Sequence, residues 1–247
     1  MEKLRDIVGK ILKKFNKNHK EFMLNPWEQL PNIAPFILPE DKELIDKHNN
    51  RWAGTDFEIL LNEIPSPYIG DPKAPIVLLN LNPGYSLGNQ ESPNLMCFRE
   101  VARANLLHQF FDYPYYVLDP TLEGTPSGYT WFMQNLGPLM RAGNLTPQEL
   151  SKKLFTVEYF PYHSVKYGWK GGILPSQKYA IHLLKEAIGK QAIIVIMRGK
   201  KVWETAVPEL IKYPNVYTLS SSQNVTVSEK NLGYDAFYKV IDILVSC

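Results

Sequence analysis

Four short apolar runs, hardly interrupted by polar residues, predict the strands of a sheet. They lie at residues 74–81, 154–160, 192–198 and 215–219. Apolar runs without an alternating polar face are typical of strands that are buried on both sides, as in parallel sheets.

Helical patterns lie between these runs, and two more lie before the first run and after the last one. Helices are predicted at residues 55–62, 94–110, 130–141, 177–188, 200–206 and 234–245. Strands that alternate with helices indicate βαβ units, and right-handed crossovers then place helices on both faces of the sheet. We therefore expect an α/β fold with a short, mostly parallel, four-stranded sheet.

Residues 1–66 have a different character, and we expect them to form a helical extension and a wrapping arm ahead of a domain at residues 67–247. Residues 1–20 hold seven lysines and arginines against two acidic residues, whereas the whole chain has a net charge of only +2. The apolar positions of this segment recur at helical spacing: Leu4, Val8, Ile11, Leu12 and Phe15. This pattern predicts a basic amphipathic helix, which either lies against a phosphate backbone or packs on the domain with a solvated lysine face.

Composition narrows the class of protein. The chain has 247 residues, 45% of them hydrophobic and 21% charged, which suits one globular core. Its two cysteines, Cys97 and Cys247, are far apart, so we expect no disulfide, no metal site and no cofactor. No apolar run approaches the length of a membrane span and the first residues are charged, so we expect a cytoplasmic protein without a membrane partner.

Polar segments follow three of the predicted strands, at residues 82–85, 160–164 and 220–228. Open α/β sheets bind ligands in the crevice beyond the carboxyl ends of their strands. In the first segment, Pro83 fixes its own φ and restricts Asn82, while Gly84 lets a ligand approach the backbone. Asn-Pro-Gly is also ordinary turn chemistry, so this motif alone does not decide between the two interpretations.

The stretch PYIGDPKAPIVLLNLNPG at residues 67–84, followed much later by a Ser/Asn-rich loop and Asn231-Leu232-Gly233, resembles the uracil-DNA glycosylase superfamily. It is most similar to the mismatch-specific and single-strand-selective branches, whose first motif ends in Asn-Pro-Gly. The resemblance spans residues 67–245. It implies a three-layer α/β/α sandwich, a DNA partner in single-stranded or duplex form, and hydrolysis of the N-glycosidic bond of a damaged or mismatched base such as uracil during DNA repair.

The same resemblance assigns roles around the first motif. Asn82 would orient the attacking water, and Pro83 and Gly84 would shape the base pocket. Tyr85 or Tyr115 would stack on a base that has been flipped out of the helix.

The second motif departs from the family, because Ser221 stands where the family carries His or Asn. A serine hydroxyl can donate a hydrogen bond to the leaving base but cannot carry the charge of an imidazolium. The other residues of this loop are candidates for contacts with DNA: Ser222, Gln223, Asn224 and Thr226.

The second predicted strand also departs from the family, which draws a base-reading Asn from this place. Glu158 and Tyr159 are the corresponding residues, and Glu158 could read the donor edge of a base other than uracil. His163, just past the strand, could compensate for the missing histidine as a catalytic residue or could be a structural, hydrogen-bonded histidine.

Two other enzyme classes lack their motifs, since the chain has no dinucleotide-binding Gly-x-Gly-x-x-Gly after the first strand and no P-loop. Two alternatives to a DNA glycosylase remain. One is a catalytically inactive domain of the same fold that binds nucleic acid or nucleotides. The other is a hydrolase of free nucleosides, which the acidic balance outside residues 1–20 favours.

Overall fold

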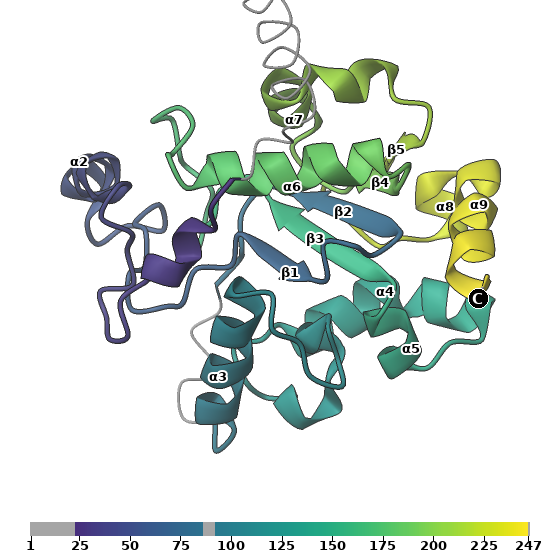
Figure 1. The fold of residues 1–247 in the computed structure, drawn as a ribbon, viewed down its shortest axis with the longest axis horizontal. Coiled ribbons are helices and arrows are strands. Elements are labelled where there is room, and N and C mark those ends of the chain that lie inside the picture. The colour runs from purple at the N-terminus through teal and green to yellow at the C-terminus, as the bar shows by residue number, and fades with distance from the viewer. Residues whose placement is uncertain (1–22, 86–91, 247) are drawn as a thin grey trace, which may run out of the picture.

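The computed structural model describes residues 23–85 and 92–246, and the predicted basic helix at residues 1–20 lies outside them. Within the described residues the chain forms an α/β fold around one five-stranded sheet of order β1-β3-β2-β4-β5 (Figure 1). The strands are β1 (Tyr68–Gly70), β2 (Ile76–Asn80), β3 (Leu154–Glu158), β4 (Ile193–Ile196) and β5 (Val216–Thr218). β2 to β5 pair in parallel and β1 pairs antiparallel with β3. The predicted fold class is confirmed.

The expected number of four strands is wrong by one, because β1 was not predicted. β1 is only three residues long and stands between Pro67 and the turn residues Asp71 and Pro72, so its sequence carries no periodicity. Its pairing with β3 nevertheless buries all three of its residues.

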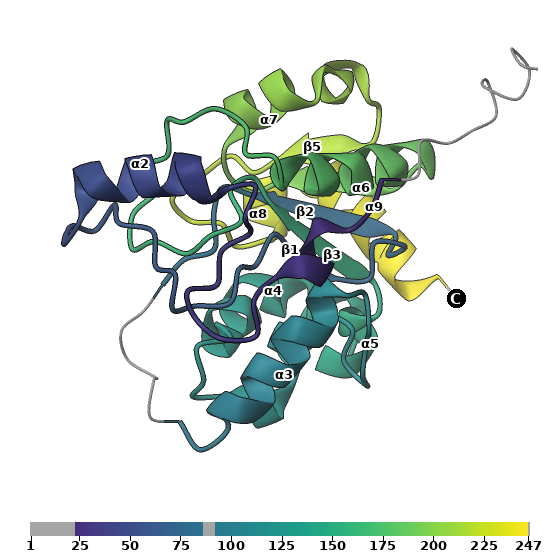
Figure 2. The same ribbon diagram turned by 60° about the vertical axis from the view of Figure 1, so that its left-hand side comes forward.

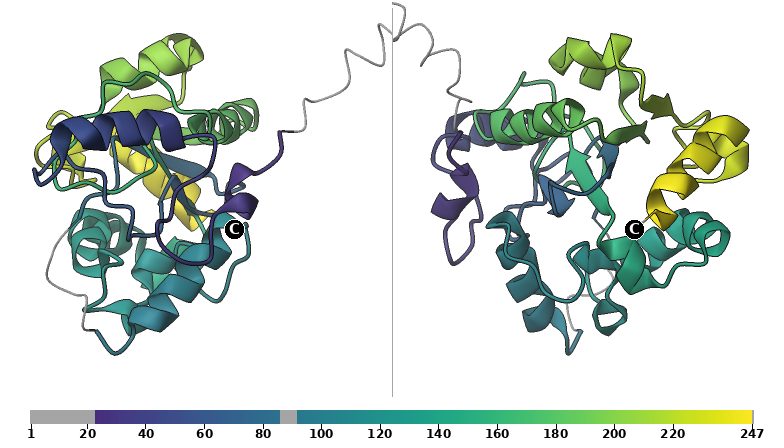
Figure 3. Two further views of the ribbon diagram at one scale, coloured as in Figure 1. Left: turned by 90° about the vertical axis from the view of Figure 1, so that its left-hand side faces the viewer. Right: turned by 45° about the vertical axis from the view of Figure 1, so that its right-hand side comes forward.

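Helices cover both faces of the sheet, in agreement with a three-layer arrangement (Figures 1 and 2). One face carries α6 (Gln177–Gly189) and α7 (Lys200–Ala206), and the other carries α3 (Leu95–Leu106), α4 (Tyr129–Gly143) and α5 (Pro147–Ser151). The chain ends in α8 (Glu229–Leu232) and α9 (Tyr234–Val245), and α9 packs against α4 (Figure 3). Short 3-10 helices lie at Pro26–Gln29, Tyr116–Leu118, Pro120–Leu122 and Pro208–Lys212.

The predicted helices at residues 200–206 and 234–245 have the observed bounds, and those at residues 94–110, 130–141 and 177–188 differ at their ends. The helix predicted at residues 55–62 is wrong, because that segment forms turns. Its Ile59 exchanges two hydrogen bonds of 2.9 Å with the side-chain amide of Asn49, so its backbone groups are satisfied without a helix.

The arm at residues 23–66 contains a further helix, α2 (Lys42–Trp52), and contributes Trp27, Leu38 and Ile45 to the same hydrophobic core as the sheet. Asp41, which is fully buried at the start of α2, connects the arm to the segment between β3 and α6. Its carboxylate accepts hydrogen bonds from the Tyr162 hydroxyl at 2.8 Å and from the Ser176 backbone N–H at 3.1 Å.

The exits of the strands position the site. After β2 the chain leaves toward α3, on one face of the sheet, whereas after β3 and β4 it leaves toward α6 and α7, on the other (Figure 1). At the carboxyl end of β2, the connecting chain therefore goes to the opposite face of the sheet from the connections that leave the two neighbouring strands. A crevice opens where neighbouring connections diverge in this way.

Gly70, the last residue of β1, can be substituted to test whether the close approach of β1 to β3 contributes to stability. It has φ +94°, and a Cβ atom there would lie 2.5 Å from the Leu154 carbonyl oxygen and 3.0 Å from the Tyr115 ring. We expect Gly70→Ala to lower the free energy of unfolding by about 2–4 kcal/mol, from backbone strain and overpacking together. Urea denaturation measures this loss.

Gly124→Ala is the matched control, because Gly124 has φ +76° but a Cβ atom there would meet nothing within 4 Å. It should cost about 1 kcal/mol, from backbone strain alone. Equal losses for the two variants would show that the close approach of β1 to Leu154 is unimportant.

Candidate functional site

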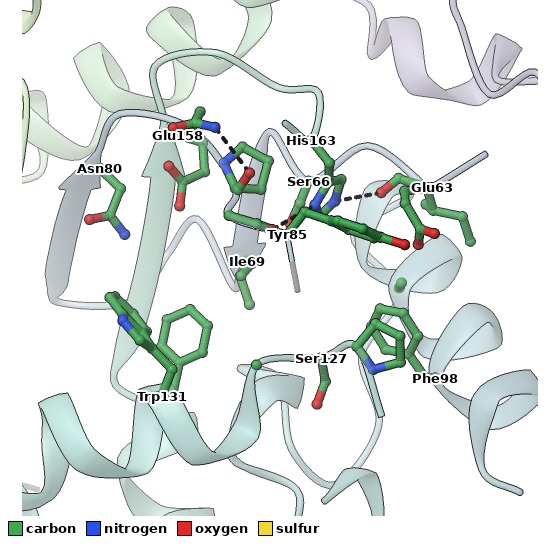
Figure 4. Close-up of a pocket in the computed structure, with 18 of the residues that line it drawn as sticks. Glu63, Ser66, Ile69, Asn80, Tyr85, Phe98, Ser127, Trp131, Glu158 and His163 are labelled. Atoms are coloured by element: carbon green, nitrogen blue, oxygen red, sulfur yellow. Dashed lines mark hydrogen bonds between the residues drawn. The ribbon is translucent and has the colours of Figure 1, made fainter. Parts of the chain in front are cut away.

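A cavity of about 340 Å³ opens at the carboxyl ends of the central strands. Its walls come from the ends of β2, β3 and β4, from α3 and α4, and from segments at residues 63–69 and 125–128 (Figure 4). It therefore lies in the crevice that the strand exits predict.

Two buried polar side chains form one wall of this cavity. Asn80 and Glu158 are directly opposite each other in the register of β2 and β3, and each is only 5% exposed. Their side chains point toward Trp131 of α4 across the cavity (Figure 4). The Asn80 amide donates a hydrogen bond to the Glu158 carboxyl group, but Asn80 Oδ1 and Glu158 Oε2 have no partner in the described residues. Because buried polar atoms are nearly always paired, these two are candidates for contacts with a ligand.

Burial gives Glu158 an unusual protonation state. It raises the pKa of the Glu158 carboxyl group to about 8, although the hydrogen bond from Asn80 and the positive charge of Arg198 both lower it. At neutral pH the carboxyl group is therefore mostly protonated and neutral. Arg198 follows β4 and lines the same cavity, and its Nε is also buried without a partner in the described residues.

Aromatic rings form the opposite wall. Trp131 and Phe132 of α4 meet edge to face with their centroids 4.8 Å apart, and Phe98 of α3 lies farther along the cavity (Figure 4). A space with polar atoms on one side and aromatic rings on the other suits a flat, polar heterocycle.

Asn82 lies at the cavity with its amide held in place. Its Nδ2 donates to the Pro83 carbonyl oxygen at 3.1 Å and to the Ser164 hydroxyl at 3.2 Å. Ser164 in turn donates to the Lys166 carbonyl oxygen at 3.0 Å. Asn82 Oδ1 accepts no hydrogen bond from the described residues, so it can accept one from water.

His163 lines the cavity and links two of its walls. Its Nδ1 lies 3.0 Å from the Gly84 carbonyl oxygen and its Nε2 lies 3.0 Å from that of Ile64. Burial lowers the pKa of His163, more than its contacts with these carbonyls raise it. Since both ring nitrogens face main-chain oxygens, we interpret His163 as a positioning residue for the loop at residues 82–85. The Tyr85 ring extends beside it over the cavity (Figure 4).

The other predicted site residues divide into two groups. Pro83, Gly84 and Tyr85 line the cavity, whereas Tyr115 and Tyr159 do not. Tyr115 is fully buried in the core, and its hydroxyl lies 2.5 Å from Thr156 Oγ1. Tyr159 packs its ring on Trp203, because side chains alternate along a strand and Tyr159 therefore faces away from Glu158.

The loop at residues 220–228 also lies outside the walls of this cavity. Asn231 holds it, accepting from the Ser221 backbone N–H at 2.9 Å and donating to the carbonyl oxygens of Asn224 and Thr226. Ser222, Gln223 and Asn224 are exposed, and the Thr226 hydroxyl donates to Asn135 of α4. The structure thus does not bring Ser221 to the cavity.

Most of the other cavity residues were not predicted, among them Asn80, Phe98, Trp131 and Arg198. The sequence could have indicated Asn80, since an amide there interrupts an otherwise apolar strand. It could not have indicated Phe98 and Trp131, because an aromatic residue at helical spacing has the same pattern whether it faces a core or a cavity.

Two broader properties follow from the described residues. None of their helices is long and apolar enough to cross a membrane. Residues 23–85 and 92–246 also contain no group of three or more His, Cys, Asp or Glu side chains placed to hold a metal ion.

Comparison of the chain with protein-family models, curated proteins and solved structures gives no match. The similarity to uracil-DNA glycosylases therefore rests on the residues alone and stays a prediction.

The raised pKa of Glu158 predicts a pH dependence of stability. Between its ordinary pKa of 4.5 and about 8, the folded protein binds more protons at this site than the unfolded chain does. The free energy of unfolding therefore falls with rising pH in this window, by at most about 1.4 kcal/mol per pH unit from this group.

Glu158→Gln removes this contribution, so its stability relative to the wild type should increase from pH 5 to pH 8, by a few kcal/mol on the scale just given. Denaturant unfolding of both proteins at several pH values measures the difference, and other titrating groups cancel because both proteins share them. Parallel stability curves would contradict the raised pKa.

Proposed function

We propose that the protein is a DNA base-excision glycosylase, which hydrolyses the N-glycosidic bond of a base held in the cavity at the end of β2. The proposal depends on one observation about the two sides of the cavity. One side has unpartnered polar atoms of Asn80 and Glu158, and the other has the aromatic rings of Trp131, Phe132 and Phe98. A base inside a duplex cannot be reached by an enzyme, so the nucleotide is extruded into a pocket that stacks the base and reads its edge.

The reaction requires an oriented water molecule, which Asn82 can supply. The oxygen of a water molecule bonds to the anomeric carbon while the carbon–nitrogen bond breaks, and the water's protons end on the sugar hydroxyl and the released base. Asn82 Oδ1 would orient this water, and the amide's contacts with Pro83 and Ser164 hold it in one direction. Because Asn82 is a neutral amide and a weak base, we expect slow turnover.

DNA as the partner is supported by cations at the same edge of the sheet. Lys170 and Lys201 are exposed on the segments that follow β3 and β4, and neither forms an ion pair within the described residues. Such lysines can contact phosphates flanking an extruded nucleotide. By contrast, Lys166 pairs with Asp56 at 2.7 Å.

The direct test is base release from fluorescent oligonucleotides that carry uracil, hypoxanthine, xanthine or a mismatched thymine, in single- and double-stranded form. We expect release from at least one of them, and we expect Asn82→Ala to reduce its rate by about 100-fold or more while DNA binding persists. Asn50→Ala is the matched control, because Asn50 is exposed on α2 and does not line the cavity.

Other outcomes identify the alternatives. Salt-dependent DNA binding without base release would favour an inactive binding domain. Release of bases from free nucleosides, without action on oligonucleotides, would favour a nucleoside hydrolase.

A further inference from the structure

His163 connects the two segments that form one end of the cavity. Its Nδ1 lies 3.0 Å from the carbonyl oxygen of Gly84, in the loop at residues 82–85, and its Nε2 lies 3.0 Å from that of Ile64, in the arm (Figure 4). A further contact fixes the backbone of His163, since the Leu60 N–H donates to its carbonyl oxygen at 2.9 Å. The imidazole ring therefore lies between a loop and an arm that both line the cavity.

The two contacts of the ring together require a protonated histidine. Both partners are carbonyl oxygens, which only accept hydrogen bonds, so both ring nitrogens must donate. A neutral imidazole has one N–H and one nitrogen without hydrogen, whereas an imidazolium has two N–H groups. Only the protonated ring can therefore bond to Gly84 and Ile64 at the same time.

When the ring is neutral, the contact with Gly84 is the one that costs less to lose. Ile64 is buried, so its carbonyl oxygen would have no water to replace the histidine. Gly84 is exposed, so water can replace the ring at its carbonyl oxygen. A Cβ atom at Gly84 would meet nothing within 4 Å, so its backbone also has space around it. The neutral ring should therefore keep its proton on Nε2, facing Ile64.

We propose that protonation of His163 fixes the loop at residues 82–85 against the arm, and that the neutral ring releases Gly84 together with Tyr85, whose ring extends over the cavity (Figure 4). His163 is then a positioning residue that acts through Gly84. The Asn82 amide has its own contact with Ser164, so protonation acts on Tyr85 more than on Asn82. The inference rests on the proposed function, because it describes how access to the same site is controlled.

Burial and charge set the pH at which the loop changes. Burial lowers the pKa of His163 from its ordinary value of 6.5, and this effect exceeds the opposite effects of the Gly84 carbonyl group, the negative charge of Glu63 and the Ile64 carbonyl group. The loop should therefore be fixed only below pH 6.5. Glu63 belongs to the arm and lines the cavity, so it supplies the charge that favours the fixed state.

The other ionisable groups on the neighbouring elements do not change charge with His163. Tyr162 and Lys166, on the same segment as His163, contact Asp41 and Asp56 of the arm. Tyr85 is the ionisable residue of the loop, and Glu158 and Arg198 line the opposite end of the cavity. Because the pKa of Glu158 is about 8, its carboxyl group stays mostly protonated between pH 4.5 and pH 7.

Nuclear magnetic resonance of the full chain, titrated from pH 7.5 to pH 4.5, tests the proposal without requiring catalysis. We expect His163 to titrate below pH 6.5, with its proton on Nε2 at pH 7.5 and with both nitrogens protonated at low pH. The backbone order parameters of Gly84 and Tyr85 should be higher below this midpoint than above it. A ring that keeps one protonation state over the whole range, or a loop whose order does not follow it, would overturn the proposal.

Two variants separate protonation of His163 from a purely structural role. His163→Gln cannot bridge both carbonyl groups by ionising, so the order parameters of Gly84 and Tyr85 should stay low and should not change with pH. PH-dependent order in this variant would overturn the proposal.

Glu63→Gln keeps the histidine and removes the negative charge, so the midpoint of His163 and the loop transition should both move to lower pH, by about one unit. Glu43→Gln is the matched control, because Glu43 is exposed on α2 and does not line the cavity. It should move neither of them. A loop transition that stays in place while the midpoint of His163 moves would overturn the proposal.

Base release over the same pH range distinguishes this inference from the proposed function. We expect kcat/KM to be about 3- to 10-fold higher below the midpoint of His163 than above it, because a larger fraction of the molecules has the Tyr85 ring in place, and we expect no such step in His163→Gln. A loop transition without base release from any oligonucleotide would support the role of His163 and contradict the proposed hydrolysis. Base release with a loop that does not respond to His163 would support hydrolysis and overturn the role of His163.

Discussion

The arrangement of the site depends on one constraint, the opposite exits of the central strand and its two neighbours. β2 leads to α3 on one face, whereas β3 and β4 lead to α6 and α7 on the other. Loops that diverge in this way cannot cover the strand ends, so a cavity remains between them. At this cavity the parallel register of β2 and β3 places their last residues opposite each other, which brings Asn80 and Glu158 together.

The sequence predicted the elements that have a clear period and missed those that do not. The four parallel strands and α7 and α9 were predicted because an apolar run or a helical stripe marks each of them. β1 is too short to show alternation, and α2 is mostly polar and buries only Ile45, so neither has a pattern to recognise. The helix wrongly predicted at residues 55–62 is an error of the opposite kind. There the side-chain amide of Asn49 forms hydrogen bonds with backbone groups that the local sequence pattern would assign to a helix.

The residues of the candidate site likewise fall into those that the sequence could place and those that it could not. Residues that directly follow a strand, such as Asn82, Tyr85 and His163, could be placed from the sequence because the ends of parallel strands share one edge. Tyr115 and Ser221 could not, because their positions depend on how connecting segments pack: one is held in the core by Thr156 and the other in a loop by Asn231. Glu158 was predicted from its strand position, but its partner Asn80 becomes evident only from the pairing of β2 with β3.

The polar pair also explains why this cavity has a functional rather than a structural interpretation. A leucine at either position would remove a buried polar atom that now lacks a partner, and such atoms cost free energy in an empty protein. A fold selected for stability alone would have no reason to keep an amide and a carboxyl group facing Trp131. A ligand that pairs with both atoms offsets that cost only when it is bound, and the cost of leaving them unpaired is what discriminates against ligands with the wrong edge. The instability of the empty site and its selectivity are then two consequences of the same unpaired atoms.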